Sequence, residues 1–295
     1  MSPEPDPAPL LRSQDTIDRA KSAEVEILDT DVALVGACDV ILSVVPPRDA
    51  EATALRVLDA ISVPGARKPD AAPLYFADMN AVAPSTVKAI AASFGRAEAA
   101  LRFVDGSIVG GPPSLKAGAE EWYLPSMPLS GPVRLLDDAP YGEALAAALR
   151  MYHISADVGA ASGLKMCFAS MSKGYTAIAI QSFATAQRLG VLGDLKDVLG
   201  AMMPARLAQT ENGLVGMAPK AYRWVREMEE ISKAFSEEGG FEPDLFRGVA
   251  EVYRTVADDT VLGQEKIGRR KRGTTSDDIA AAVIEGLDRK KKKTE

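Results

Sequence analysis

Three short apolar runs between residues 39 and 111 constrain the fold more than any other feature of the sequence. They read DVILSVVPP, PLYFADMN and LRFVDGSIVGG, and each is halted by proline, glycine or a polar residue. Single segments with helical periodicity, residues 48–62 and 84–100, separate the runs. Buried strands that alternate with helices predict a doubly wound parallel sheet with right-handed crossovers. Two further short strands, EWYLP at 121–125 and GPVRLL at 131–136, are expected to extend this sheet.

The pattern changes at about residue 142, where the strand signals end and long helical patterns follow. We therefore expect a Rossmann-like domain over residues 1–141, an all-helical domain over residues 142–268 and a basic, partly disordered tail over residues 269–295. Ligands of open α/β sheets bind at the carboxyl ends of the strands. The candidate site is accordingly placed at the turns that follow the three apolar runs.

Composition narrows the class of protein. The formal charge of −7 gives no electrostatic footprint for nucleic acid, and the clustered positive charge lies in GRRKRG and RKKKK near the end of the chain. Two cysteines and one histidine cannot form a disulfide framework or a typical His/Cys zinc site, so no metal is predicted. No apolar run of about 18 residues and no secretory signal are present, so we expect a cytoplasmic protein without a membrane partner.

Lys165 stands among small and apolar residues in GAASGLKMCFASMSKG, residues 159–174. A long cationic side chain can lie along an apolar helix and send its ammonium group to water. The ammonium can instead be held in a cleft to transfer a proton, because burial lowers the pKa of lysine. The segment by itself leaves both interpretations open.

Taken together, these residues resemble the β-hydroxyacid dehydrogenase superfamily, which includes 6-phosphogluconate dehydrogenase, 3-hydroxyisobutyrate dehydrogenase and the imine reductases. GAASGLKMCFA is similar to the family's lysine segment, with Gly159 and Lys165 at matching places. The resemblance covers residues 12 to about 258. It implies a Rossmann-type sheet, a helical 6-phosphogluconate dehydrogenase C-terminal-like domain, an NADP cofactor, a small-molecule substrate and a homodimer. It also implies that Lys165 is the general acid and base during hydride transfer.

The resemblance further implies contacts to the cofactor and the substrate. RSQDTIDRA is similar to the segment after the family's second strand, where Arg12 and Ser13 meet a 2′-phosphate. SVVPP resembles the segment beside the nicotinamide ribose, with Val45 and Pro46, and DMNAVAP resembles a motif that carries Asn80.

For the substrate, DGSIVGG offers Gly110 and Gly111 at the family's carboxylate-binding turn, where Val109 replaces the usual serine. Ala169 stands where the family has an asparagine. On a regular helix Ser172 would lie about two turns beyond Lys165 on the same face, with Lys173 beside it, and these two residues are the replacement substrate contacts.

One departure from the family concerns the cofactor. The chain has no G-x-G-x-x-G turn of the kind whose glycines let a pyrophosphate approach a helix N-terminus. The first βα unit of the usual domain is therefore expected to be missing, as in an N-terminally truncated Rossmann fold, and NADP binding is expected to be weak or lost.

Two alternative functions remain beside the NADP-dependent oxidoreductase. One is a catalytically silent family member that acts as a dimerising or regulatory domain. The other is a protein that binds nucleic acid or an anionic surface through its basic tail, against which the acidic body argues. Single residues give weaker signals: Asp78 and Asp105 suit helix capping, His153 has no recognisable catalytic partner, and Cys167 points away from the face of Lys165.

Overall fold

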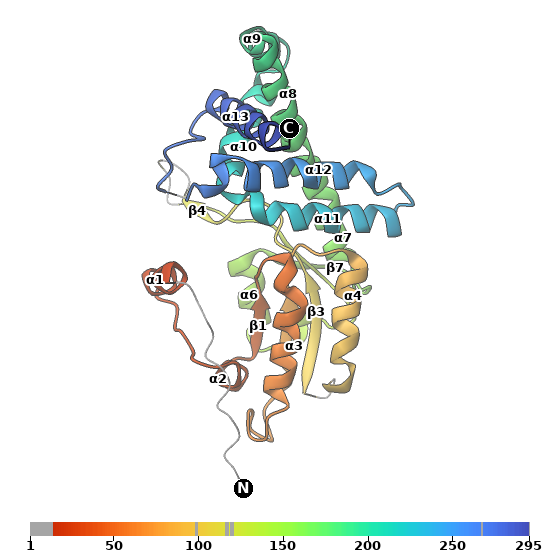
Figure 1. Ribbon diagram of the computed structural model, residues 1–295. Coiled ribbons are helices and arrows are strands. Elements are labelled where there is room, and N and C mark those ends of the chain that lie inside the picture. The colour runs from red at the N-terminus through yellow and green to blue at the C-terminus, as the bar shows by residue number, and fades with distance from the viewer. Residues whose placement is uncertain (1–13, 98–99, 116–117, 119–120, 267, 295) are drawn as a thin grey trace. The chain divides into compact units, whose positions relative to one another are not determined.

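The computed structural model describes residues 14–97, 100–115, 118, 121–266 and 268–294 of the chain, and Arg12 and Ser13 lie outside these residues (Figure 1). It divides into two compact units. The first comprises the chain up to residue 45 together with residues 49–80 and 86–161, and the second comprises residues 46–48, 81–85 and 162–295.

The first unit is built on a five-stranded sheet with the strand order β1-β2-β3-β6-β7. These strands are β1 (Val40–Ser43), β2 (Leu74–Asp78), β3 (Leu101–Gly106), β6 (Met127–Ser130) and β7 (Met151–Ser155). β1, β2 and β3 run parallel, β6 is antiparallel to β3, and β7 is parallel to β6. The three strands predicted from the apolar runs are confirmed, and so is the predominantly parallel, Rossmann-type sheet.

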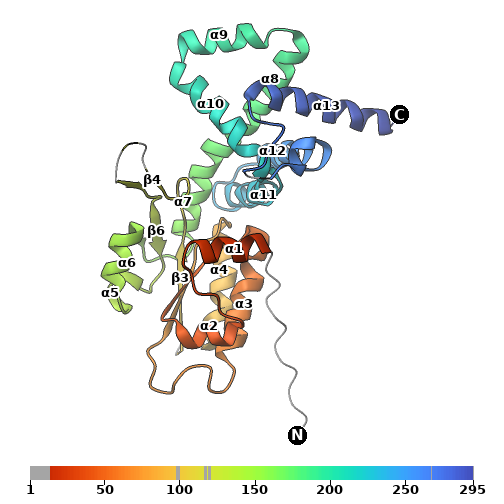
Figure 2. The ribbon, with the colours of Figure 1, turned by 90° about the vertical axis from the view of Figure 1, so that its left-hand side faces the viewer.

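Helices cover both faces of this sheet, as Figure 2 shows with the sheet nearly edge-on. α3 (Ala50–Ile61) and α4 (Pro84–Ser93) lie on one face, and α5 (Leu135–Asp138) and α6 (Gly142–Leu149) lie on the other. The unit also contains α1 (Gln14–Ser22) and α2 (Asp31–Ala37). Every residue of β2 is buried. Its alternating side chains therefore serve two cores: Phe76 packs with Phe94 and Phe103, and Tyr75 packs with Val104 and Leu135.

Two predicted strands are corrected by the structure. EWYLP contains β5 (Trp122–Tyr123), but β5 pairs with β4 (Ser114–Leu115) in a separate two-stranded ribbon and does not extend the main sheet. GPVRLL leads into the short helix α5. The sheet is extended instead by β6 and β7, whose sequences MPLS and MYHIS are only partly apolar, so they lack a clear strand pattern.

The second unit is helical. It contains most of α7 (Ala160–Ala169), a π-helical turn (Ser170–Gly174), α8 (Tyr175–Leu189), α9 (Leu192–Met202), α10 (Pro204–Met217), α11 (Ala221–Glu237), α12 (Asp244–Arg254) and α13 (Ser276–Thr294). Its core joins buried residues from all of these α-helices except α9, among them Met166, Phe183, Met228 and Tyr253. Three leucines of α9 pack against this core and are partly buried: Leu192, Leu195 and Leu199. None of the helices in the described part of the chain is long and apolar enough to cross a membrane.

The structure places the boundary between the units after Ala161, later than the predicted residue 141. α6 and β7 belong with the sheet, because β7 pairs with β6 and α6 covers the sheet face. The segment expected to be a partly disordered tail also differs from the prediction. Residues 276–294 form α13, which buries Ile279 and Val283 in the helical core, while its basic residues remain exposed.

Candidate functional site

Asn80 joins the carboxyl ends of β1 and β2. Its side-chain Oδ1 accepts a hydrogen bond from the backbone N–H of Val45 at 2.7 Å, and its Nδ2 donates to Ser43 Oγ at 3.1 Å. The structure thus brings together two of the predicted cofactor contacts, Val45 and Asn80. Pro46 follows directly in the chain and is exposed. Since both polar atoms of the Asn80 amide form hydrogen bonds, this side chain links the end of β2 to the end of β1 and to the turn that follows it.

Asp78 is the last residue of β2, two residues before Asn80, and it is almost completely buried. Its Oδ1 accepts a hydrogen bond from the backbone N–H of Asn80 at 2.9 Å, whereas its Oδ2 has no hydrogen-bond partner among the residues that the structure describes. Burial raises the pKa of Asp78 from 3.8 to about 6, the hydrogen bonds from Asn80 oppose this rise, and the nearby carboxylate of Asp105 adds to it. The carboxyl group therefore titrates just below neutral pH.

Asp105 accepts a hydrogen bond from the backbone next to the start of α7. In the parallel register it lies opposite Asp78, and its Oδ2 accepts hydrogen bonds from Ser130 Oγ at 2.7 Å and from the backbone N–H of Gly159 at 2.8 Å. Ser130 Oγ in turn accepts from the N–H of Ala161 at 3.0 Å. These bonds satisfy backbone donors at the N-terminus of the helix that carries Lys165. Ser130 was missed in the sequence because the strand that carries it was missed.

The predicted substrate turn at Gly110 and Gly111 follows β3 and is exposed. Gly110 has φ +128°, and a Cβ added there would lie 2.5 Å from the hydroxyl oxygen of Tyr123. The backbone N–H of Gly111 donates a hydrogen bond to the same oxygen at 3.3 Å. Glycine at residue 110 is therefore required by both the backbone conformation and the close approach of Tyr123 from β5.

Lys165 lies in the middle of α7 and is half-buried. Burial lowers the pKa of its ammonium group from 10.5 to about 8; the positive charge of Lys173 lowers it further, and the negative charge of Glu227 acts in the opposite direction. A lysine with a pKa near 8 has both protonation states available close to neutral pH, which suits a general acid and base.

Lys173 lies in the π-helical turn that follows α7 and is held by α11. Its ammonium group forms an ion pair with the carboxylate of Glu227, and it lies 4.9 Å from the ring centroid of Trp224. The hydroxyl of the buried Tyr253 donates a hydrogen bond to the backbone carbonyl of Lys173. Glu227 was not singled out in the sequence. The sequence signal that could have identified it is a glutamate three residues after Trp224, on the same face of an amphipathic helix.

The π-helical turn changes the expected placement of Ser172. We placed Ser172 and Lys173 by the spacing of a regular helix, but the i→i+5 pattern of a π-helical turn alters that spacing. The Ser172 hydroxyl donates to the carbonyls of Phe168 at 3.2 Å and Ala169 at 3.3 Å, which are in its own helix. Single π-helical turns within α-helices are frequent at functional sites, and this one sits between Lys165 and α8.

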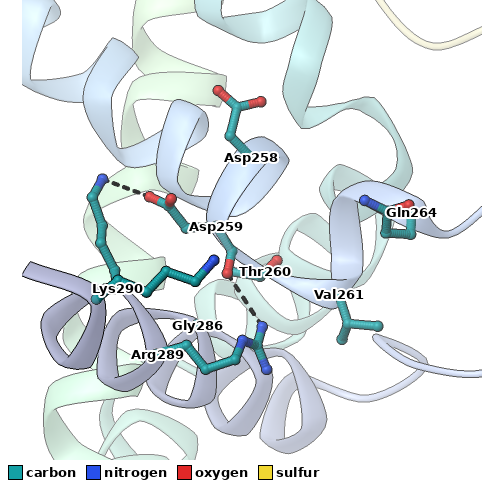
Figure 3. A pocket seen from close by; sticks show the side chains of 9 residues that line it. Asp258, Asp259, Thr260, Val261, Gln264, Gly286, Arg289 and Lys290 are labelled. Carbon is teal, nitrogen blue, oxygen red and sulfur yellow. Dashed lines mark hydrogen bonds and ion pairs between the residues drawn. The ribbon is translucent and has the colours of Figure 1, made fainter.

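The helical unit also has cavities whose linings do not include Lys165. One cavity of about 600 Å³ lies between α13 and the segment before it, where Lys290 is paired with Asp259 and the Arg289 guanidinium donates to the carbonyl of Asp259 (Figure 3). A second, apolar cavity of about 320 Å³ is lined in part by Cys167 and Phe241. Among the residues that the structure describes, no cluster of His, Cys, Asp and Glu could hold a metal ion.

Many solved structures are similar to this chain, and two of them are described first. A conserved hypothetical protein from Sinorhizobium meliloti 1021 has a TM-score of 0.57 at 22% identity, with 92% of this chain and 83% of that chain covered. The 3-hydroxyisobutyrate dehydrogenase of Mycobacterium tuberculosis, solved with L-serine, has a TM-score of 0.56 at 17% identity, with 93% and 88% covered. The fold is that of the 3-hydroxyisobutyrate dehydrogenases. The resemblance to the β-hydroxyacid dehydrogenase superfamily is thus confirmed at the level of the fold, a Rossmann-type unit followed by a helical one.

A third solved structure has the same fold. A conserved protein of unknown function, described as structurally similar to 3-hydroxyacid dehydrogenases, has a TM-score of 0.54 at 22% identity, with 84% of this chain and 85% of that chain covered. Residues 186–256, which run from the end of α8 to the π-helical turn after α12, match a domain of unknown function, DUF1932. No curated protein sequence is similar to the chain at a significant level.

Proposed function

We propose that the protein is an NADP-dependent oxidoreductase that transfers hydride to or from a small hydroxy acid or a related carbonyl or imine. The observation that carries this proposal is Lys165, whose pKa burial lowers to about 8 within a 3-hydroxyisobutyrate dehydrogenase fold. Catalytic lysines are tuned in this way by burial and by neighbouring cations. The fold supports the reaction class by analogy, and the half-buried lysine supports the proton transfer.

Lys165 has a defined role in each direction of the proposed reaction. During oxidation, the neutral amine accepts the proton of the substrate hydroxyl group while the carbon gives up its hydride. During reduction, the protonated amine donates a proton to the carbonyl oxygen or to the imine nitrogen. When bound, the nicotinamide supplies the acceptor or donor of that hydride.

The turn after β1 fits the nicotinamide end of such a cofactor. Val44 in this turn is 61% exposed, Pro46 is exposed as well, and the backbone of Val45 is fixed by Asn80. The helices that follow the parallel strands β1 and β2 are α3 and α4, and neither begins with a glycine-rich turn. We therefore propose that the described strand ends hold the nicotinamide portion and that the overall affinity for NADP is weak.

Lys165→Met tests the proposed mechanism. Methionine keeps the length and apolar stem of lysine but cannot exchange a proton, so the chemical step is expected to slow by a factor of about 10² to 10⁴ while folding persists. NADPH oxidation with a panel of small keto acids and imines is the assay, and NADPH affinity is measured separately by fluorescence titration. In the wild type, the rate of reduction should fall as the pH rises through about 8, because the protonated lysine is consumed.

The exposed lysine Lys68 offers a matched control, and Lys68→Met is expected to retain the wild-type rate. Equal turnover by wild type and Lys165→Met would reject the role of Lys165. Binding of NADPH without turnover of any compound in the panel would support the cofactor and contradict the proposed substrate class.

A catalytically silent protein is the second candidate, and Ala169 favours it. This residue stands where the dehydrogenase pattern has an asparagine. Its side chain is a buried methyl group, which cannot form a hydrogen bond with a substrate hydroxyl. Under this alternative the chain acts as a dimerising or regulatory domain. Failure to bind NADPH at millimolar concentration, together with a stable dimer, would support it over the oxidoreductase.

We further propose that the protein is a homodimer formed through its helical unit. α9 contributes no buried residue, although it is rich in apolar side chains, and Val198 and Met202 are 54% and 75% exposed. Exposed apolar helix faces of this kind mark interfaces between protein chains. Sedimentation velocity at micromolar concentration should give the mass of a dimer, and Met202→Glu with Val198→Glu should shift it to the monomer. A monomer mass for the wild type would exclude this assembly.

A further inference from the structure

A buried polar cluster surrounds the backbone from which α7 begins. Its members are Asp105 at the end of β3, Ser107 directly after that strand and Ser130 at the end of β6, and all three are completely buried. Burial of a carboxylate and two hydroxyl groups costs free energy unless they form hydrogen bonds. The hydrogen-bond partners of these side chains therefore indicate what the cluster does, and they converge on residues 159–161.

The cluster binds this stretch of backbone through three hydrogen bonds. Asp105 Oδ2 accepts from the N–H of Gly159 at 2.8 Å, and Ser130 Oγ accepts from the N–H of Ala161 at 3.0 Å. The Ser107 hydroxyl donates to the carbonyl of Ala161 at 3.0 Å. The hydroxyl proton of Ser130 is itself donated to Asp105 Oδ2 at 2.7 Å, which leaves the lone pairs of Ser130 Oγ to accept from the backbone.

Ala161 connects the cluster to Lys165. α7 begins at Ala160, and the carbonyl of each residue in an α-helix accepts from the N–H four residues later, which pairs Ala161 with Lys165. Gly159 has φ +102°, a conformation that glycine adopts without strain, so the chain enters the helix through a turn whose N–H is bound by Asp105. The cluster thus fixes the first turn of α7, one helical turn before Lys165.

Helix capping alone does not explain the contact from Ser107. Capping side chains satisfy the free N–H groups at a helix start, as Asp105 and Ser130 do here. The Ser107 hydroxyl instead donates to a carbonyl that already has a partner within the helix. This bond is not needed to satisfy the helix, and its effect is to hold the first turn beside the segment that follows β3. Three bonds from the ends of two strands leave this turn little freedom to shift or rotate.

We propose that Asp105, Ser107 and Ser130 are positioning residues that hold Lys165 in its half-buried place through the first turn of α7. This assignment rests on the proposed oxidoreductase function, to which it adds the residues that position the proton-transferring lysine. A general acid must lie within hydrogen-bond reach of the atom that it protonates, so a small displacement of the helix start slows the chemical step. The three side chains are buried and act only through the backbone of α7.

Ser130→Ala and Ser107→Ala test the proposal, with Ser93→Ala as the matched control. Ser93 donates to the carbonyl of Ile90 in α4, so the control removes a serine–carbonyl bond of the same kind from another helix. NADPH oxidation is the assay. We expect kcat to fall at least about tenfold in Ser130→Ala and by a smaller factor in Ser107→Ala, while the Kd for NADPH stays unchanged. Ser93→Ala should keep the wild-type kcat.

The pKa of Lys165 gives a second readout that needs no turnover. Reductive methylation with ¹³C followed by NMR reports the titration of each lysine, and Lys165→Arg identifies the resonance of Lys165. Burial lowers the pKa of Lys165 from 10.5 to about 8. A helix start that is no longer fixed lets the ammonium group reach more water, so this pKa should rise toward 10.5 in Ser130→Ala and stay at the wild-type value in Ser93→Ala.

Circular dichroism at the assay temperature establishes that each variant is folded. Ser107→Ala keeps the test decisive if Ser130→Ala does not fold, because the Ala161 carbonyl retains its partner within the helix. Folded variants with the wild-type kcat and the wild-type pKa of Lys165 would overturn the proposal, as would an equal change in Ser93→Ala. A raised pKa of Lys165 in a protein that turns over no compound would support the positioning role and contradict the proposed reaction.

Discussion

Asp78 gives the structure a defined dependence of stability on pH. The side chain is buried at the end of β2, its Oδ2 accepts no hydrogen bond from the described part of the chain, and burial raises its pKa from 3.8 to about 6. The folded protein therefore binds this proton more tightly than the unfolded chain does. The resulting stabilisation is fully present below about pH 4 and is lost as the pH rises through about 6.

The size of the effect follows from the shift. At about 1.36 kcal/mol per pKa unit, a rise from 3.8 to about 6 makes the free energy of unfolding fall by about 3 kcal/mol across this pH window. Asp78→Asn has no titrating group and should lack this decline. The difference in unfolding free energy between wild type and variant should consequently change by about 3 kcal/mol between pH 4 and pH 7.5.

Urea unfolding followed by tryptophan fluorescence measures this difference. The chain has two tryptophans, one in each unit, so a Trp224→Phe background leaves Trp122 as the reporter of the first unit. Asp70→Asn replaces an exposed aspartate and serves as the control. Parallel pH profiles for wild type and Asp78→Asn would refute the reasoning, because they would show that Asp78 has the same proton affinity in both states.

Two other substitutions have predictable effects on stability. Gly110→Ala should destabilise the first unit by about 1–3 kcal/mol in urea unfolding, because alanine disfavours φ +128° and its Cβ would meet the Tyr123 hydroxyl. Tyr123→Phe should relieve part of this cost in the double variant, and an unchanged unfolding free energy for Gly110→Ala would contradict the prediction. Glu227→Ala leaves the Lys173 ammonium without its carboxylate and should destabilise the helical unit by about 3 kcal/mol. The fluorescence of Trp224 in a Trp122→Phe background measures this loss, and the exposed control Glu143→Ala should stay within about 0.5 kcal/mol of the wild type.

The fold was predictable where hydrophobic runs are long enough to identify an element. β2 and β3 are fully or largely buried and β1 alternates between buried and partly buried residues, and their apolar runs end at polar turns, so the sequence pattern identifies them. β6 and β7 were not found because proline, histidine and serine interrupt their apolar residues, and they owe their strand conformation to pairing, with each other and, for β6, with β3. The burial of α13 likewise depends on the helix it packs against, which a local pattern does not reveal.

The candidate site was predictable only in part. Lys165 was identified from its unusual position among small residues, and its half-buried setting agrees with that interpretation. Its electrostatic environment was not predictable, because Lys173 and Glu227 are brought together by a π-helical turn and by α11 from distant parts of the sequence. Likewise, the engagement of Asn80 with Val45 and Ser43 depends on the pairing of β1 with β2.

The position of α7 limits where the chain can be divided to build chimaeric proteins. The helix runs from Ala160 to Ala169, whereas the boundary between the compact units falls after Ala161. A fragment that begins at Ser162 would start inside a helix and would lack Gly159 and Ala161, whose backbone N–H groups donate to Asp105 and Ser130. Chimaeras should therefore exchange the whole stretch from β3 through α7 as one piece, because a junction at the apparent domain border would fray the helical turn that leads to Lys165.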